Sequence, residues 1–204
     1  MTMKVRDVMP AAENSSNFNI VPDPITKVGT TLENLKAAVN GETGASAKYA
    51  ACAAAAKEQG FNQISRLFEA TSAAEQIHIG LEMGVINSIE PDYERPAAPE
   101  AEGVQTDLNL IAGALGEIYE TSDMYPSFIQ KAIEEDEPKA VFAFTRAKLA
   151  ESVHAELYMD AYNNIDAEDD QTYYLCPICG YIHKGDDFDK CPICFTAADK
   201  FRAF

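Results

Sequence analysis

The stretch AKLAESVHAELY, residues 147–158, decides the fold that the rest of the chain must complete. It contains no helix breaker, and helical periodicity places Glu151 and His154 on one side, one turn apart. Ala147 and Tyr158 lie on the same stripe, which makes this the face that a helix buries. Burying a charge without a partner costs several kcal/mol. We therefore expect Glu151 and His154 to meet partners from other helices.

Three other segments carry ionisable residues on apolar helical stripes. A second Glu-x-x-His motif is formed by Glu75 and His78, and single carboxylates occur at Glu42 and Glu117. The spacing repeats, because Glu42 and Glu75 are 33 residues apart and Glu117 and Glu151 are 34 apart. This pattern suggests an internal duplication. Each half consists of a helix with one Glu followed by a helix with Glu-x-x-His.

The periodicity predicts an all-α chain with a small appended domain. The four predicted helices cover residues 30–60, 62–88, 106–135 and 138–164. The first begins at a capping box formed by Thr30 and Glu33, and the third is expected to be interrupted near Pro126. Short turns within each pair of helices and a proline-rich crossover between the pairs describe a ferritin-like four-helix bundle. The predicted domains are an N-terminal arm (1–28), the bundle (29–166) and a C-terminal domain (172–204).

The buried carboxylates predict a metal site inside the bundle. One Glu from each of two helices, with Glu-x-x-His from the other two, is the ligand pattern of di-iron and di-manganese carboxylate proteins. Several ionised carboxylates in one bundle would repel each other, and two divalent ions would offset that charge. Exposed glutamates and ordinary core histidines are the alternative for any single residue, but explain the whole set poorly. The predicted ligands are Glu42, Glu75, His78, Glu117, Glu151 and His154.

Glu120 gives the bundle one more potential ligand than the symmetric plan requires, because the first helix has Ala45 at the equivalent position. A ferric ion favours an anionic carboxylate, whereas a ferrous ion tolerates neutral imidazole. We hypothesise a redox-linked exchange in which the iron moves between Glu120 and His78. The hydroxyls of Tyr49 and Tyr125 could donate hydrogen bonds to ligand carboxylates, and ordinary core tyrosines are the alternative. The candidate catalytic residues are thus Glu120, His78, Tyr49 and Tyr125.

A cysteine-rich segment, CPICGYIHKGDDFDKCPIC, occupies residues 176–194 after an acidic linker. Its two C-x-x-C pairs are separated by eleven residues, which predicts a tetrahedral sulfur cage for iron or structural zinc. The spacing does not choose between the two metals, and two disulfides are disfavoured in the cytoplasm. The predicted ligands are Cys176, Cys179, Cys191 and Cys194.

The overall charge and hydropathy exclude several classes of protein. The formal net charge of the 204 residues is -17, which argues against binding nucleic acid or an anionic membrane through a basic surface. No apolar run approaches the length of a membrane span, and the N-terminus lacks the apolar region of a signal peptide. We expect a cytoplasmic protein.

The two metal motifs, in this order, resemble the rubrerythrin family, and within it most of all the nigerythrin branch. The segments that carry the resemblance are residues 32–50, 67–82, 116–128, 147–158 and 176–195. The resemblance implies a non-haem di-iron centre and a rubredoxin-like iron held by four cysteines. It also implies a peroxidase that reduces hydrogen peroxide to water.

The resemblance also implies a role for each bundle ligand. By this resemblance, Glu75 and Glu151 would be the bridging carboxylates. Glu42 and Glu120 would bind one iron, with His78 replacing Glu120 on reduction. The other iron is completed by Glu117 and His154.

The mode of electron supply is a further expectation. The cysteine-bound iron would refill the di-iron site one electron at a time, fed by a rubredoxin or by NADH through a separate reductase, since the chain has no dinucleotide-binding fingerprint. About ten helical residues, roughly 15 Å, follow His154, so we expect a long gap between the centres of one chain and a head-to-tail homodimer that shortens it. The alternatives are a ferroxidase, iron-storage or oxygen-reducing di-iron protein, and a non-catalytic redox carrier or zinc module.

Overall fold

The computed structural model describes residues 24–204, so most of the predicted arm, residues 1–28, lies outside the described residues. Its described part contains no helix or strand. The backbone N–H groups of Ile25 and Thr26 donate to the carboxylate of Asp123, at 2.8 and 3.2 Å. This segment is thereby attached to the third helical region of the bundle.

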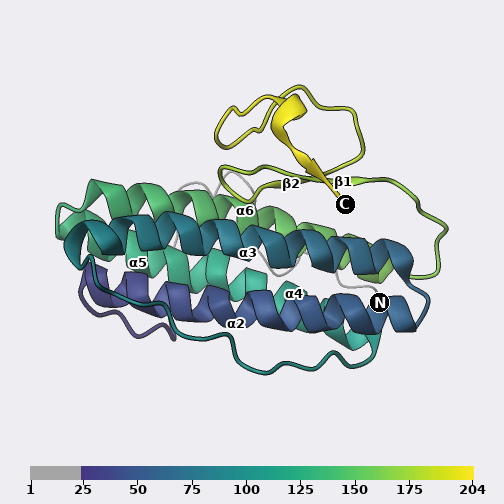
Figure 1. Cartoon of the computed structure of the whole chain (residues 1–204), viewed down its shortest axis with the longest axis horizontal. Helices are drawn as coiled ribbons and strands as arrows, with labels where there is room; N and C mark the ends of the chain where they lie inside the picture. Colours follow the sequence, from purple (N-terminus) through teal and green to yellow (C-terminus); the bar gives the residue numbers. More distant parts are fainter. Residues whose placement is uncertain (1–23) are drawn as a thin grey trace.

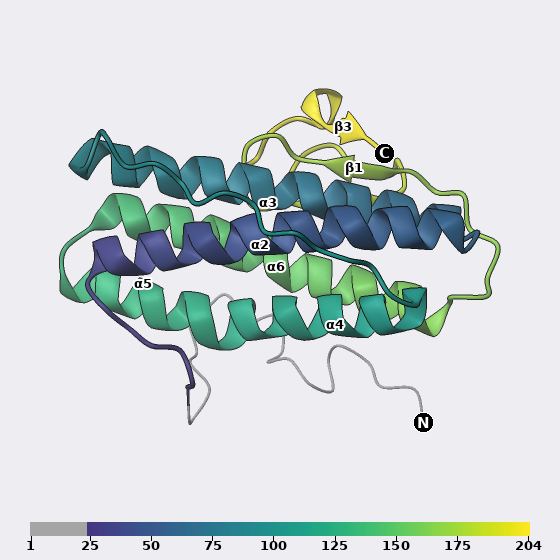
Figure 2. The ribbon, with the colours of Figure 1, turned by 60° about the horizontal axis from the view of Figure 1, so that its bottom comes forward.

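Four long helical segments lie side by side and form the predicted all-α ferritin-like bundle (Figure 1). Their helices are α2 (Thr31–Glu58), α3 (Asn62–Ile89), α4 (Thr106–Tyr119), the π-helix η2 (Glu120–Met124), α5 (Tyr125–Glu134) and α6 (Pro138–Asn163). Short turns join α2 to α3 and α5 to α6, as predicted. The crossover between α3 and α4 runs lengthwise across the bundle (Figure 2).

The start of α2 confirms the predicted capping box. The Thr30 side chain accepts a hydrogen bond from the Glu33 N–H, and the Glu33 carboxylate accepts one from the Thr30 N–H. Such a cap contributes about 1 kcal/mol to the stability of a helix. At the other end Gly60 adopts a φ of 89°, a conformation that glycine supplies without strain and that turns the chain into α3.

The third helical segment is irregular, but at a different place from the one predicted. No break occurs at Pro126, which lies in the first turn of α5, where its missing N–H costs little. The change comes earlier, at η2, where the Tyr125 N–H bonds to the carbonyl of Glu120, five residues back. Single π turns of this kind occur often at functional sites. Here the π turn begins at Glu120, the surplus carboxylate of the sequence.

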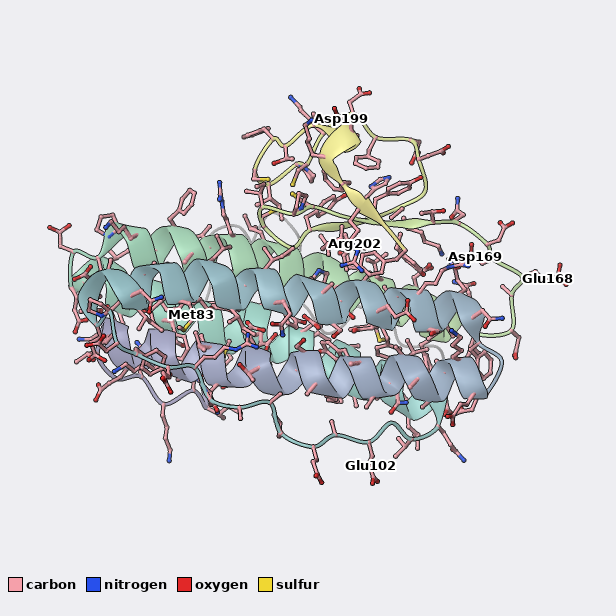
Figure 3. All side chains as sticks on the ribbon, in the orientation of Figure 1. Met83, Glu102, Glu168, Asp169, Asp199 and Arg202 are labelled. Carbon is pink, nitrogen blue, oxygen red and sulfur yellow. The ribbon has the colours of Figure 1, made fainter. Side chains whose placement is uncertain are left out.

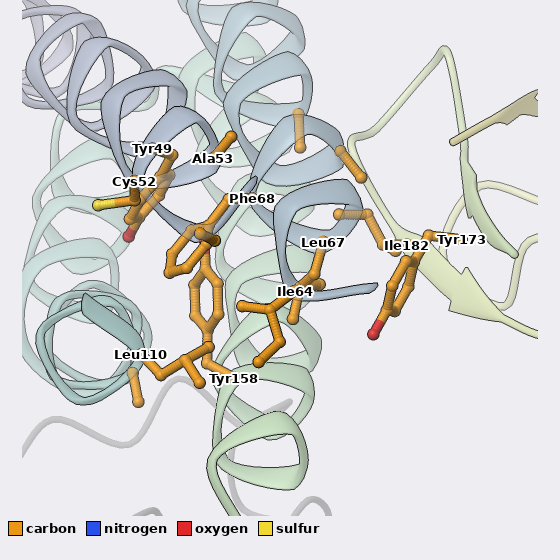
Figure 4. Close-up of a cluster of buried hydrophobic side chains, with 14 of the residues drawn as sticks. Tyr49, Cys52, Ala53, Ile64, Leu67, Phe68, Leu110, Tyr158, Tyr173 and Ile182 are labelled. Atoms are coloured by element: carbon orange, nitrogen blue, oxygen red, sulfur yellow. The ribbon is translucent and has the colours of Figure 1, made fainter. Parts of the chain in front are cut away.

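The C-terminal domain is a small three-stranded antiparallel sheet placed over α3 and α6 (Figure 1). Its strands are β1 (Tyr173–Leu175), β2 (Ile182–Lys184) and β3 (Arg202–Ala203), in the order β2-β1-β3, with a 3-10 turn η3 at Ala198–Lys200. Tyr173 and Ile182 pack against the bundle beside Ile64 and Leu67 (Figure 4). One apolar cluster therefore contains side chains from both domains.

The apolar core of the bundle divides into two clusters. One surrounds Tyr49, Phe68 and Tyr158, whose ring centroids are 5.0 to 6.1 Å apart (Figure 4). The other contains Tyr125 and Phe144. The buried carboxylates and histidines belong to neither cluster. In the described part of the chain, no helix has the length and apolar character needed to cross a membrane.

Candidate metal centres

The six ligand candidates that the sequence analysis singled out are all fully buried in the interior of the bundle. Each has no exposed surface, and together they come from all four helical segments. They are Glu42 on α2, Glu75 and His78 on α3, Glu117 on α4, and Glu151 and His154 on α6. The expected burial of these ligand candidates is confirmed, so the alternative of exposed surface glutamates is wrong.

These side chains form two overlapping groups, and in each group one ligand atom per residue lies within 4.8 Å of the others. The first group consists of Glu42, Glu75, His78 and Glu151, and the second of Glu75, Glu117, Glu151 and His154. Glu75 and Glu151 belong to both. The arrangement therefore offers two neighbouring sites with two shared carboxylates.

The two histidines are oriented by the backbone of the cysteine domain. His78 Nε2 lies 3.1 Å from the carbonyl oxygen of Cys179, and His154 Nε2 lies 2.9 Å from that of Gly180. A carbonyl accepts and does not donate, so each Nε2 carries the proton. The lone pair of each imidazole is then on Nδ1, as in histidines that bind a metal.

The Nδ1 atoms face carboxylate oxygens. His78 Nδ1 is 2.6 Å from Glu151 Oε1, and His154 Nδ1 is 2.6 Å from Glu151 Oε2. A lone pair that faces an ionised carboxylate at this distance is repulsive unless a proton or a metal cation lies between them. Within the described residues, His154 Nδ1 and both Glu151 oxygens make no hydrogen bond of acceptable geometry. The donor set and its orientation therefore fit metal ions.

Burial strongly perturbs these groups. Desolvation raises the pKa of Glu75 and Glu151 well above the usual value, and neighbouring carboxylates add to the rise. Desolvation likewise raises the pKa of Glu42 to about 7. Burial lowers the pKa of His78 to about 3, which keeps its imidazole neutral. Burial also acts to raise the pKa of Glu117, but the neighbouring His154, Glu151 and Tyr49 together outweigh it and lower the pKa.

These shifts predict that metal-free protein, prepared with a chelator, loses stability as the pH rises from 4.5 to 7. The raised carboxyl pKa values mean that the folded state binds more protons than the unfolded state, and each such group costs about 1.4 kcal/mol per pH unit across this window. His78 acts in the opposite sense below pH 6.5, but it is one group against several. Urea unfolding at pH 5 and pH 7 measures the difference. Greater stability at pH 7 would contradict this prediction.

Two tyrosines donate hydrogen bonds to the buried carboxylates, as the sequence suggested. The Tyr49 hydroxyl donates to Glu117 Oε1 at 2.6 Å, and the Tyr125 hydroxyl contacts Glu42 Oε1. Glu120 is less completely buried as a residue and is a member of neither ligand group, although burial raises its pKa well above the usual value. In this structure His78, and not Glu120, occupies the first group.

One buried carboxyl was missed by the sequence analysis. Glu82 on α3 has no exposed surface, and its Oε1 lies 3.0 Å from the hydroxyl of Tyr125. Desolvation, reinforced by the charge of Glu42, raises its pKa well above the usual value. The available signal was its spacing, since Glu82 lies one turn beyond His78 on the same stripe.

The four cysteine sulfurs form the second metal centre. Cys176 Sγ and Cys194 Sγ are 3.4 Å apart, and Cys179 Sγ and Cys191 Sγ are 3.5 Å apart. A tetrahedral ion with metal–sulfur bonds near 2.3 Å requires sulfur separations of roughly 3.8 Å, so the cage fits a metal. All four thiols are free, which excludes the disulfide alternative in this structure.

The two centres are adjacent within one chain, which corrects the expectation of a long gap. That expectation extended α6 away from the site and ignored the path of the linker. Instead, the residues after Asn163 fold back, and the Cys179–Gly180 peptide segment touches both His78 and His154. Cys179, a predicted ligand of the cysteine cage, is thus joined by a single hydrogen bond to His78, a ligand candidate of the bundle. The geometric reason given for a dimer no longer holds.

Comparison with known proteins agrees with a helical bundle followed by a cysteine-bearing domain. The family model described as Rubrerythrin matches residues 33–162, and that described as "Rubrerythrin, rubredoxin-like domain" matches residues 174–202. Nigerythrin of Nitratidesulfovibrio vulgaris is 64% identical over 99% of this chain and 100% of its own. Rubrerythrin-2 of Clostridium acetobutylicum is 32% identical over 87% of this chain and 98% of its own.

Solved structures give the same result. One described as "Fully reduced state of nigerythrin (all ferrous)" has a TM-score of 0.92 at 64% identity, covering 99% of this chain and 100% of that chain. The residues described above fit two iron ions in the bundle and one in the cysteine cage. With the family models matching both domains and the relatives covering nearly the whole chain, the protein belongs to the rubrerythrin family.

Proposed function

We propose that this protein is a non-haem di-iron peroxidase that reduces hydrogen peroxide to water and so defends the cell against oxidative stress. The observation that carries the proposal is the contact between the two centres, in which the Cys179 and Gly180 carbonyls accept hydrogen bonds from His78 and His154. A short connection between two metal centres is useful when one centre passes electrons to another that consumes them. A ferroxidase needs no external electrons, so the cysteine domain would be without use there.

The ligand roles follow the two groups of the bundle. Glu75 and Glu151, which belong to both groups, would be shared by the two ions. Glu42 and His78 complete one site, and Glu117 and His154 complete the other, with Glu120 as the alternative to His78. Cys176, Cys179, Cys191 and Cys194 hold the third iron. Two ferrous ions in the bundle supply the two electrons that cleavage of one O–O bond requires.

The residues around the site hold protons and exclude water. The Tyr49 hydroxyl donates a hydrogen bond to Glu117 Oε1, and the Tyr125 hydroxyl contacts Glu42 Oε1. We infer that these hydroxyls and Glu120, whose pKa burial raises well above the usual value, donate protons to the leaving hydroxide. The fully buried ligand layer lies between the two apolar clusters, so competing reactions with bulk water are limited.

We further propose that His78 and Glu120 exchange with the oxidation state. His78, a member of the first ligand group, would be the ligand in the reduced state, and Glu120 would replace it after oxidation because a ferric ion favours an anionic ligand. The π turn at Glu120 gives this segment an irregular hydrogen-bond pattern that can rearrange. Crystal structures of the reduced and the oxidised protein test the exchange. The same ligands in both states would contradict it.

A spectroscopic experiment tests the function itself. Chemically reduced protein is mixed with one equivalent of hydrogen peroxide, or with oxygen, and the visible sulfur-to-iron band is followed. A peroxidase recovers the band quickly with peroxide and slowly with oxygen. Faster recovery with oxygen would favour an oxidase or ferroxidase. No band in either sample would mean that the cysteine cage holds zinc and that the electron route is wrong.

The partners and the compartment are part of the proposal. The electrons come from a rubredoxin or from NADH through a separate reductase. Four free thiols arranged as metal ligands suit a reducing compartment, the cytoplasm. A head-to-tail homodimer follows from the family resemblance. Sedimentation equilibrium tests this, and a fully active monomer would contradict it.

A further inference from the structure

Glu82 is a buried carboxyl that the site described above does not use. It has no exposed surface, and it follows Ile79 on a face of α3 that also carries Val85 and Ile86, both buried in the second apolar cluster. It is a member of neither group of possible metal ligands. The charged group that acts most strongly on it is Glu42, a second carboxyl. An ionised Glu82 would therefore be a desolvated anion next to another anion, which is costly.

The hydrogen bonds around Tyr125 determine where a proton must be. The Tyr125 hydroxyl contacts Glu42 Oε1 and also lies 3.0 Å from Glu82 Oε1. A phenol has one proton to donate, so it can donate to only one of these two oxygens. The other contact is attractive only if that carboxyl is protonated and donates to the phenolic oxygen.

The two carboxyls differ in their other contacts. Glu42 belongs to the ligand group, and its Oε2 accepts no hydrogen bond within the described residues, so it can bind a cation as an anion. Glu82 Oε2 is also buried without a hydrogen-bond partner there, but no ligand group includes it. The neutral, protonated carboxyl of this pair should therefore be Glu82.

We propose that Glu82 is a proton store, linked to the metal site by a one-directional hydrogen-bond chain from Glu82 through Tyr125 to Glu42. On delivery, the O–H bond of Glu82 breaks as a new O–H bond forms on Tyr125. The original Tyr125 proton passes by way of Glu42 Oε1, which the hydroxyl contacts, to the hydroxide left by cleavage of peroxide, which becomes water. No electrons are exchanged in this transfer, and its net change is one proton moved from Glu82 to that hydroxide. The use of this proton rests on the proposed peroxidase function, whereas its storage does not.

Infrared spectroscopy of the reduced, iron-loaded full-length protein tests the storage. The spectrum of the wild type minus that of Glu82→Gln should contain the C=O stretching band of a protonated carboxylic acid, shifted in D₂O. Glu102→Gln is the matched control, because Glu102 projects from the crossover into solvent (Figure 3), and the spectrum of the wild type minus that of Glu102→Gln should contain no such band. Absence of the band from the wild type minus Glu82→Gln spectrum would overturn the proposal.

A second variant keeps the test decisive if Glu82→Gln fails to bind iron. In Tyr125→Phe the acid loses its acceptor, so its band should move to higher frequency. An unmoved band would show that the protonated group is not Glu82.

Kinetics test the delivery. Glu82→Gln keeps an amide N–H that can donate to Tyr125, but it cannot release a proton. Oxidation of the reduced protein by peroxide should therefore slow by about a hundredfold, with the solvent isotope effect changed. A wild-type rate with a wild-type isotope effect would overturn delivery by Glu82. If the wild type itself fails to react with peroxide, the proposed function is wrong, and the infrared band still decides the storage.

Discussion

Replacing Glu151 with Gln should remove both metal ions from the bundle and, at the same time, make the metal-free protein more stable. Glu151 belongs to both ligand groups, and its two oxygens face His78 and His154 at 2.6 Å. Its loss therefore damages both sites at once. Gln has nearly the same volume, but its amide is a poor substitute for an anionic bridge between two cations.

The gain in stability without metal follows from the pKa of Glu151. Burial raises this pKa well above its usual value of 4.5, so folding at pH 7 requires a carboxyl that is ionised in the unfolded chain to take up a proton. That uptake destabilises the folded state at pH 7, and Gln avoids it. The gain should disappear near pH 4.5, where the unfolded carboxyl is protonated as well.

Elemental analysis and urea unfolding measure the two effects together. In Glu151→Gln, the iron of the cysteine cage should remain while that of the bundle is lost. The chelated variant should be more stable than the chelated wild type at pH 7 by on the order of 1 kcal/mol for each unit by which the Glu151 pKa is raised. Glu156→Gln, at an exposed position of the same helix, is the control and should behave like the wild type. Iron retained in the bundle of Glu151→Gln would refute Glu151 as a shared ligand.

The features that the sequence predicted well are those that depend on local periodicity. The helix spacing of Glu75 with His78, and of Glu151 with His154, placed each pair on one buried face, because residues three apart on a helix are neighbours. The capping box at Thr30 is likewise a contact between residues three apart. The cysteine cage was predictable because each C-x-x-C pair already brings two sulfurs together.

The features that were missed depend on contacts between distant segments. Glu82 is on the correct stripe, but only the approach of Tyr125 from another segment reveals its use. The π turn at Glu120 has no sequence signal of its own, since it arises from how the third segment packs. The docking of the cysteine domain was predicted wrongly, because a count of helical residues gives a length and not the direction of the linker.

The docking contact leads to the second large effect, which is expected at Gly180. This residue has a φ of 78°, and a Cβ built on it would lie 2.3 Å from His78 Nε2. His78 cannot retreat easily, because its Nδ1 is directed into the ligand group at 2.6 Å from Glu151. The Cys179–Gly180 segment must therefore move away by about 1 Å, beyond the range of its hydrogen bonds to the two histidines.

Gly180→Ala should thus separate the two centres without removing iron from either. Because a misplacement of about 1 Å at a reacting centre can cost about a hundredfold in rate, the peroxide-driven return of the sulfur-to-iron band should slow by about that factor.

A matched control separates this effect from backbone strain. Gly185 lies in the same domain with a φ of 90°, and a Cβ there meets only the ends of two side chains at 3.5 Å. Gly185→Ala therefore suffers a similar conformational penalty without touching His78, and it should keep the wild-type rate. If both variants slow equally, strain in the cysteine domain is the cause. If Gly180→Ala reacts like the wild type, the Cys179–Gly180 contact is not the route by which electrons reach the bundle.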